Sequence, residues 1–128
     1  LVFHLLYLSY KERSKIVKIR NLKYTSMKAL NKETANKTVR PERIIQFGEG
    51  NFLRAFVDWI IYNMDQKTDF NSSVVVVQPI DKGMVDMLNA QDCLYHVNLQ
   101  GLDKGETVNS LTMIDVISRA LNPLHSER

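Results

Sequence analysis

The sequence predicts an α/β fold in which a strand, a helix and a second strand begin a parallel sheet. Ile44–Phe47 is a short apolar run that ends at a glycine, and Val74–Val77 is an unbroken β-branched run typical of a strand buried on both faces. Between these runs, apolar residues recur with helical spacing. With 128 residues, of which 45% are hydrophobic and 24% charged, the chain has the composition of a globular domain rather than of a disordered or collagenous chain.

The first strand is followed by the turn Gly48-Glu49-Gly50 and a predicted helix over about Phe52–Gln66. Asn51 is a residue type that caps helix N-termini. The helix has a broad apolar stripe and a narrower polar face, and we expect it to pack by the apolar stripe. The stripe comprises Leu53, Phe56, Val57, Ile60, Ile61 and Met64, and the polar face comprises Arg54, Asp58, Tyr62 and Asp65.

The pattern continues beyond the second strand with a short helix and a hairpin. Asp81-Lys82-Gly83 begins a second, weaker helical pattern that runs to about Gln91. Leu94–Leu99 and Glu106–Ile114 alternate as strands do, and Asp103-Lys104-Gly105 between them is a hairpin signal. The predicted order is therefore β-α-β, then a short helix and a β-hairpin.

The net charge of +3 hides an asymmetry between two parts of the chain. Residues 1–43 hold 11 Lys/Arg and 3 Asp/Glu, a net charge of +8, whereas residues 44–128 hold 6 and 11, a net charge of −5. Between Lys11 and Lys37 the basic residues alternate with Ser, Asn and Thr without a sustained helical stripe. We therefore expect a solvated or poorly ordered arm here, and no nucleic-acid partner.

The N-terminus shows no targeting signal. Leu1–Tyr10 is apolar, but it is well short of the roughly 20 residues of a membrane helix and lacks the charged start and cleavage site of a signal peptide. No membrane partner is expected, and Cys93, the single cysteine, suits the reducing cytoplasm. Because the signals for order improve after Met27, residues 1–26 are predicted to lie upstream of the natural start. Residues 27–43 then form an N-terminal segment, and residues 44–124 the folded domain.

Gly48-x-Gly50, between a strand and a helix, is the candidate functional motif. A pyrophosphate needs backbone N–H donors at a helix N-terminus with no Cβ in the way. The third glycine of the G-x-G-x-x-G fingerprint would fall at Leu53, so the motif is incomplete. The turn is therefore either dinucleotide-binding, in a partial Rossmann-like domain, or purely structural; the strand and helix around it favour binding. Glu49 counts against binding if its carboxylate faces the phosphates.

The end of the second strand bears on the choice of cofactor. An acidic residue there accepts a hydrogen bond from a ribose 2′-OH, and a basic one accommodates a 2′-phosphate. Gln78 follows the strand directly, and Asp81 is the nearest carboxylate. Asp81 either binds the ribose or caps the helix that follows. No arginine stands here, which favours NAD over NADP, although Lys82 is close.

Several separated segments carry a family resemblance. Ile44–Trp59 (IIQFGEGNFLRAFVDW), Val74–Asp81 (VVVVQPID) and Gln91–Tyr95 resemble the mannitol dehydrogenase family of polyol long-chain dehydrogenases. Within that family they resemble the tagaturonate reductases, also called altronate oxidoreductases. The resemblance runs from about Met27 to Pro123. Mannitol-specific relatives have a histidine where this chain has Leu53, so the uronate-pathway branch fits better.

The resemblance implies NAD-dependent reduction of D-tagaturonate to D-altronate, with Gly48, Gly50 and Asn51 around the pyrophosphate. Phe52 and Leu53 fall in the first helical turn, where core packing is the alternative role. Arg54 either reaches a phosphate or pairs with Asp58 one turn on, and we favour the pair. The cofactor-binding residues expected from the resemblance are Ile45, Gln46, Phe47, Gly48, Glu49, Gly50, Asn51, Phe52, Leu53, Arg54, Ala55, Phe56 and Asp81.

The resemblance also implies that the catalytic residues lie elsewhere. The family uses Lys, Asn and His, spaced K-x-x-x-x-N-x-x-H in a C-terminal domain. Lys104 and Asn109 reproduce the first interval, but Thr112 stands at the histidine position. We therefore expect no catalytic residue and no metal site in this chain, and we expect residues 125–128 to depart from the family.

The resemblance implies that this chain is a partial NAD-binding domain that is inactive alone, and that the full-length enzyme binds a hexuronate-derived substrate. The alternatives are a fragment of a fructuronate reductase or mannitol dehydrogenase, or a non-enzymatic binding module with a basic arm.

Overall fold

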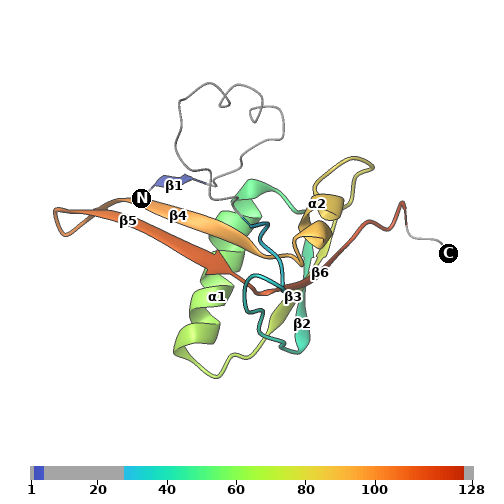
Figure 1. Cartoon of the computed structure of the whole chain (residues 1–128), viewed down its shortest axis with the longest axis horizontal. Coiled ribbons are helices and arrows are strands. Elements are labelled where there is room, and N and C mark those ends of the chain that lie inside the picture. The colour runs from blue at the N-terminus through green and yellow to red at the C-terminus, as the bar shows by residue number, and fades with distance from the viewer. Residues whose placement is uncertain (1, 5–27, 126–128) are drawn as a thin grey trace.

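The computed structural model describes residues 2–4 and 28–125, which form two three-stranded sheets and two helical segments (Figure 1). One sheet is parallel and has the strand order β2-β3-β6, and the other is antiparallel with the order β1-β4-β5. The strands are β1 (Val2–His4), β2 (Glu42–Phe47), β3 (Ser73–Val77), β4 (Tyr95–Asp103), β5 (Glu106–Ile114) and β6 (Ile117–Leu121). The helices are the π-helical turn η3 (Leu53–Val57), α1 (Asp58–Lys67) and α2 (Val85–Ala90).

The parallel sheet confirms the predicted β-α-β start. β3 lies between β2 and β6, with Phe47 opposite Val77 and Val77 opposite Leu121. Val74, Val75 and Val76 are all buried, as expected for a central parallel strand. β6 was not predicted, because the polar Ser118 and Arg119 interrupt its apolar run.

The hairpin is also confirmed, and it is longer than expected because β4 continues to Asp103. Lys104 (φ 52°) and Gly105 (φ 87°) both have left-handed backbone conformations, which is the geometry of a two-residue hairpin turn. The end of the hairpin extends away from the rest of the molecule (Figure 1). Leu102 and Leu111 are exposed there.

The predicted packing face of the first helix is only partly confirmed, because the buried face is rotated toward the polar residues. The helical segment runs from Asn51 to Lys67, and its first part, η3, is π-helical. Arg54 (2% exposed) and Asp58 (0%) from the expected polar face point into the protein together with Ile61. Of the other stripe residues, Leu53 and Val57 are partly buried, and Phe56, Ile60 and Met64 are exposed. The polar face can be buried because its side chains bind partners outside the helix. Arg54 donates to Glu49 O, Asp58 accepts from Tyr95, and Asp65 forms an ion pair with Arg40.

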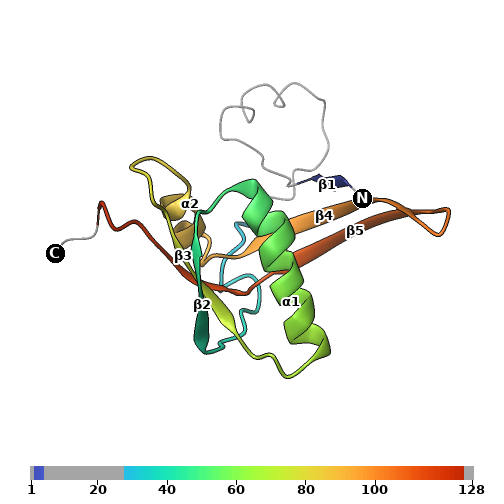
Figure 2. The same ribbon diagram turned by 180° about the vertical axis from the view of Figure 1, so that it is seen from behind.

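α2 is shorter than the predicted helix. It begins at Val85, and residues 81–84 form bends rather than a first helical turn. Val85 and Leu88 pack into the core beside Val74, Val76 and Ala120. α1 lies beside β5 in both ribbon views (Figures 1 and 2).

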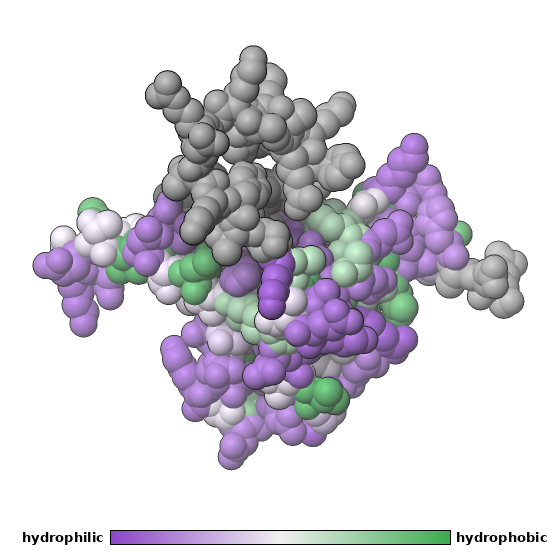
Figure 3. Space-filling model, viewed as in Figure 1, coloured by the Kyte–Doolittle hydropathy of each residue, from purple (hydrophilic) through white to green (hydrophobic). Residues whose placement is uncertain are grey.

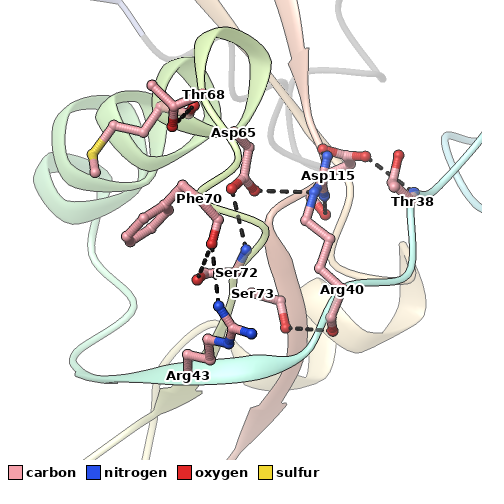
Figure 4. A network of polar contacts seen from close by, with 10 residues as sticks. Thr38, Arg40, Arg43, Asp65, Thr68, Phe70, Ser72, Ser73 and Asp115 are labelled. Carbon is pink, nitrogen blue, oxygen red and sulfur yellow. Dashed lines mark hydrogen bonds and ion pairs between the residues drawn. The ribbon is translucent and has the colours of Figure 1, made fainter.

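The segment before β2 is fastened to the domain through Lys32 and Lys37, although residues 32–34 and 36 are exposed, as predicted for a solvated segment. Lys37 Nζ donates to the carbonyls of Asp92 (2.6 Å) and Ser118 (2.9 Å). Lys32 lies 3.5 Å from the Asp92 carboxylate, and Arg40 enters a buried polar network (Figure 4). Residues 5–27, which include most of the predicted leader, lie outside the described part of the chain, whereas Val2–His4 pair with β4.

Hydrophilic residues cover much of the face seen in Figure 3, and apolar residues reach the surface between them.

The parallel sheet has one covered and one open side. Ile45 and Phe47 of β2 are exposed on the open side, where Glu42 and Arg119 form a two-point ion pair across the sheet (2.9 and 3.0 Å). No helix among residues 28–125 is long and apolar enough to cross a membrane.

Candidate cofactor-binding site

The glycine-rich turn lies at the end of β2, beside the end of β3. Gly48 has φ 112°, a conformation that favours glycine, and its N–H donates to Val77 O at 2.8 Å. A Cβ at this position would lie 2.9 Å from Leu53 Cδ1. Position 48 therefore requires glycine for both backbone and packing reasons.

Gly50 borders open space at the start of the helix. A Cβ built at Gly50 meets no atom within 4 Å, so the absence of a side chain here leaves room that the fold itself does not fill. The first N–H groups of a helix lack intrahelical partners, and the helix dipole favours an anion beside them. The geometry therefore fits a phosphate group near Gly50.

Asn51 is the first helical residue, and the prediction that it caps the helix is wrong. No side-chain cap is found at the start of η3, and Asn51 Oδ1 instead accepts from Arg54 Nη2 at 2.7 Å. Asn51 thereby becomes part of a network beneath the turn.

Arg54 holds the turn from inside the protein. Its Nε donates to Glu49 O at 2.8 Å, and its guanidinium carbon lies 5.6 Å from the centre of the Tyr95 ring. The side chain is buried, so it is not placed to meet a phosphate at the surface. The positive charge of Arg54 does act on Asp58, where it partly opposes the rise in the pKa that burial causes.

Asp58 is a buried carboxyl beneath the same turn. The hydroxyl of Tyr95 lies 3.2 Å from Asp58 Oδ2 and 3.0 Å from Arg54 O, so its single proton is shared between these two acceptors. Burial raises the pKa of Asp58 from 3.8 to about 6, although Tyr95, Gln46 and Arg54 each oppose this rise. Burial and the nearby Asp58 also raise the pKa of Tyr95 well above its usual value.

Glu49 is buried and is directed at the loop after β3. A Cβ at Gly83 would collide with the carboxylate of Glu49 and with the carboxamide of Gln78. The carboxylate therefore points neither to solvent nor to the open space at Gly50. This contact also joins the glycine-rich turn to the loop that carries Asp81.

Asp81 lies in that loop with its side chain exposed. It does not cap α2, because the residue before that helix is Met84, which makes no side-chain cap. Its Oδ1 lies 2.8 Å from Nε2 of His125, in the segment after β6. The Asp81 loop follows β3 and the His125 segment follows β6, so both lie at the carboxyl ends of parallel strands, where open α/β sheets bind ligands.

A pocket of about 360 Å³ lies between these two segments, large enough for part of a small-molecule ligand. It holds charges of both signs. Its lining residues are Gln78, Asp81, Lys82, Gly83, Val85, Asp86, Asn122 and His125. The sequence did not indicate a role for Asn122 or His125, because the strand that positions them, β6, was not predicted.

The other predicted site residues divide between surface and interior. Phe52 is 72% exposed and stacks on Phe56, with ring centres 5.3 Å apart, so the alternative of core packing is wrong for Phe52. Gln46 and Ala55 are buried, and Gln46 Nε2 donates to Gly48 O at 3.2 Å. The structure thus brings Gly48, Glu49, Gly50, Asn51 and Arg54 together, with the Asp81 loop in contact through Gly83.

The residues that reproduce part of the catalytic spacing lie in the hairpin. Lys104 lies in the hairpin turn, and Asn109 and Thr112 lie on β5. Among residues 28–125, no group of three or more His, Cys, Asp or Glu could hold a metal ion.

Comparison with known proteins places this geometry in a family. Residues 42–126 match the Mannitol dehydrogenase Rossmann domain. The chain belongs to the mannitol dehydrogenase family. The match includes the glycine-rich turn, β3 and β6, and it confirms the partial Rossmann-like fold. A Rossmann domain of a dehydrogenase family binds a nucleotide cofactor.

Similar proteins carry the name altronate oxidoreductase. The chain is 92% identical over 97 residues to that of Phocaeicola vulgatus and 94% identical over 97 residues to that of Bacteroides thetaiotaomicron, which in each case is 76% of this chain and 20% of the relative. The Bacillus subtilis protein of the same name is 50% identical over 97 residues, 75% of this chain and 20% of its own length. The chain thus spans about one fifth of the length of these relatives. The high sequence identity confirms the predicted resemblance to altronate oxidoreductases.

A solved structure supports the fold. The substrate-free crystal structure of D-sorbitol dehydrogenase superposes with a TM-score of 0.50 at 22% sequence identity, covering 67% of this chain and 18% of that chain.

Proposed function

We propose that this chain is the NAD(H)-binding part of an oxidoreductase that interconverts D-altronate and D-tagaturonate. The name altronate oxidoreductase of relatives that are 92% and 94% identical supports the reaction. The observation that carries the binding role is the open space at Gly50, at the start of a helix that directly follows the first parallel strand.

In this proposal Gly48 shapes the turn, Gly50 leaves room for the pyrophosphate, and Asn51 begins the helix whose N–H groups face it. Asp81 accepts a hydrogen bond from the ribose 2′-OH. Arg54 and Glu49 position the turn from within. NAD supplies the hydride acceptor of the reaction, and the residues of this chain bind and orient it.

Turnover requires groups that we do not find among the described residues, so we expect the 128-residue chain to bind cofactor without oxidising altronate. The hexuronate-derived substrate then binds to the rest of a longer enzyme. The buried, free thiol of Cys93 is consistent with a cytoplasmic location.

The test is calorimetric titration of the chain with NADH, comparing Gly50→Ala with the native sequence. Alanine at position 50 meets no clash, so we expect its unfolding temperature to be unchanged while NADH affinity falls about tenfold, because the methyl group takes space from the phosphate. Ser110→Ala, at an exposed position of β5, serves as the control and leaves NADH affinity unchanged.

Absence of NADH binding by the native chain, or equal affinity of Gly50→Ala, would overturn the binding role. NADH oxidation with tagaturonate by this chain alone would overturn the claim of inactivity.

A further inference from the structure

The loop between β3 and α2 carries two side chains of opposite charge next to each other. Asp81 and Lys82 are both exposed, and both line the pocket beside the carboxyl ends of β3 and β6. In dinucleotide-binding sheets, an acidic side chain in this region accepts a hydrogen bond from a ribose 2′-OH, whereas a basic one accommodates a 2′-phosphate. The conformation of the loop therefore decides which of these two groups the pocket favours.

Gln78, directly after β3, holds this loop from inside the protein. The residue is only 2% exposed. Its Nε2 donates to Ile80 O (2.8 Å) and Asp81 O (3.2 Å), and its Oε1 accepts from Val85 N (3.1 Å), at the start of α2. Because the amide nitrogen meets two backbone acceptors and the amide oxygen meets a backbone donor, the orientation of the carboxamide is fixed. One buried side chain thereby ties the loop to both β3 and α2.

A second carboxamide, from Asn122 after β6, donates to the same two carbonyl groups. Asn122 Nδ2 lies 3.3 Å from Ile80 O and 3.2 Å from Asp81 O, and Asn122 Oδ1 accepts from Leu124 N (2.9 Å). Side chains from the ends of two neighbouring parallel strands thus fix the backbone that carries the Asp81 carboxylate. His125 Nε2 lies 2.8 Å from Oδ1 of this carboxylate, whose second oxygen can accept from a ligand.

Gly83 lets the loop lie directly against Gln78. A Cβ at Gly83 would collide with the Gln78 carboxamide and with the Glu49 carboxylate. The loop is therefore packed onto the side chain that bonds to it, so the loss of that side chain's donors is felt by the loop backbone.

We propose that Gln78, assisted by Asn122, is the positioning residue that makes this pocket prefer NADH over NADPH. The inference rests on the proposed function, in which Asp81 binds the ribose. The two carboxamides hold the loop so that Asp81, rather than Lys82, meets the 2′ position. Asp81 then accepts from the 2′-OH of NADH and repels the 2′-phosphate of NADPH. Without these donors the loop is no longer fixed, and Lys82 can reach a 2′-phosphate.

The experiment measures the ratio of dissociation constants, Kd(NADPH)/Kd(NADH), by calorimetry at pH 8.0, where the 2′-phosphate is ionised. For the native chain we expect a ratio of about ten or more. Gln78→Met keeps an unbranched side chain but removes its donor and acceptor, and the ratio should fall about threefold or more. Asn122→Leu should lower the ratio by a smaller factor, because its bonds to the loop are longer. A purely structural defect weakens both cofactors alike and leaves the ratio unchanged.

Lys82→Met tests whether the released loop brings the lysine to the phosphate. The substitution should raise the ratio more in the Gln78→Met background than in the native chain, because Lys82 meets the 2′ position only in the released loop. Gln91→Met is the matched control. It removes a hydrogen bond from a glutamine side chain to Leu94 O (3.0 Å) outside the pocket, and it should keep the native ratio.

A native ratio near one, or an unchanged ratio in both Gln78→Met and Asn122→Leu, would overturn the role of the two carboxamides while NADH binding still stands. Equal effects of Lys82→Met in the two backgrounds would do the same. Asn122→Leu changes a half-buried side chain and carries the test if Gln78→Met does not fold. If the native chain binds neither cofactor, both this inference and the proposed function fail.

Discussion

Arg54 Nε donates to the carbonyl oxygen of Glu49 at 2.8 Å from inside the protein, so a helix residue fastens the turn that precedes its own helix. Nη2 of the same guanidinium donates to Asn51 Oδ1 (2.7 Å) and contacts Met84 Sδ (3.1 Å). Met84 belongs to the loop after β3. One buried cation therefore sets the relative position of the two loops that are proposed to meet the cofactor.

Arg54→Lys should loosen this arrangement, because an ammonium group cannot reproduce the planar fork of donors. We expect a loss of about 2–4 kcal/mol in the free energy of unfolding. Amide hydrogen exchange at residues 49–52 should also become faster. Arg43→Lys, at an exposed arginine, should change stability by less than about 0.5 kcal/mol. Unchanged exchange in Arg54→Lys would contradict the role assigned to the guanidinium.

Gly48→Ala should destabilise the fold, in contrast to Gly50→Ala. At Gly48 a methyl group would be 2.9 Å from Leu53 Cδ1, on a backbone with φ 112°. Together these effects should cost about 1–3 kcal/mol, measured by urea denaturation. At Gly50 the methyl group meets open space, and stability should not fall. Equal stability of the two variants would contradict this assignment.

The strands and the hairpin could be predicted because local patterns determine them. Val74–Val77 needs no knowledge of its neighbours to indicate a buried strand, and Asp103-Lys104-Gly105 fixes its own turn geometry. The glycine pair likewise located the candidate site, since few residues other than glycine fit such a turn.

The helix face and the pocket could not be predicted because both depend on distant partners. Arg54 and Asp58 are buried through contacts with Glu49 O and Tyr95, which no helical periodicity reveals. A hydrophobicity pattern therefore selects a neighbouring face, which shares Ile61 with the buried face but also carries the exposed Phe56. His125 reaches Asp81 across 44 residues because β6 pairs beside β3.

Asp58→Asn should change how stability depends on pH. The pKa of Asp58 is raised from 3.8 to about 6 in the folded protein, so the folded state binds its proton more tightly than the unfolded state does. Its contribution to stability is therefore fully present below about pH 4 and is lost as pH rises through about 6, a change of about 3 kcal/mol.

Asparagine does not ionise, so the variant does not lose this contribution as pH rises. The free energy of unfolding of Asp58→Asn minus that of the native chain should therefore increase by about 3 kcal/mol between pH 4 and pH 7.5. Urea denaturation at several pH values measures this difference. Asp69→Asn, at an exposed aspartate, is the control and should show no such trend. A difference between Asp58→Asn and the native chain that stays constant with pH would contradict the raised pKa.

Arg40→Ala should be the most destabilising of these changes. Arg40 lies between Asp65 of α1 (3.0 Å) and Asp115, after β5 (3.2 Å), with side-chain exposures of 6%, 2% and 7% (Figure 4). Removing the cation leaves two buried carboxylates without their partner, which costs about 3–5 kcal/mol. Arg119→Ala breaks an ion pair with Glu42 at the surface, where solvent screens the attraction, and it should destabilise the fold far less. Urea denaturation of both variants measures these losses, and similar losses would show that burial of the Arg40 network does not govern its contribution.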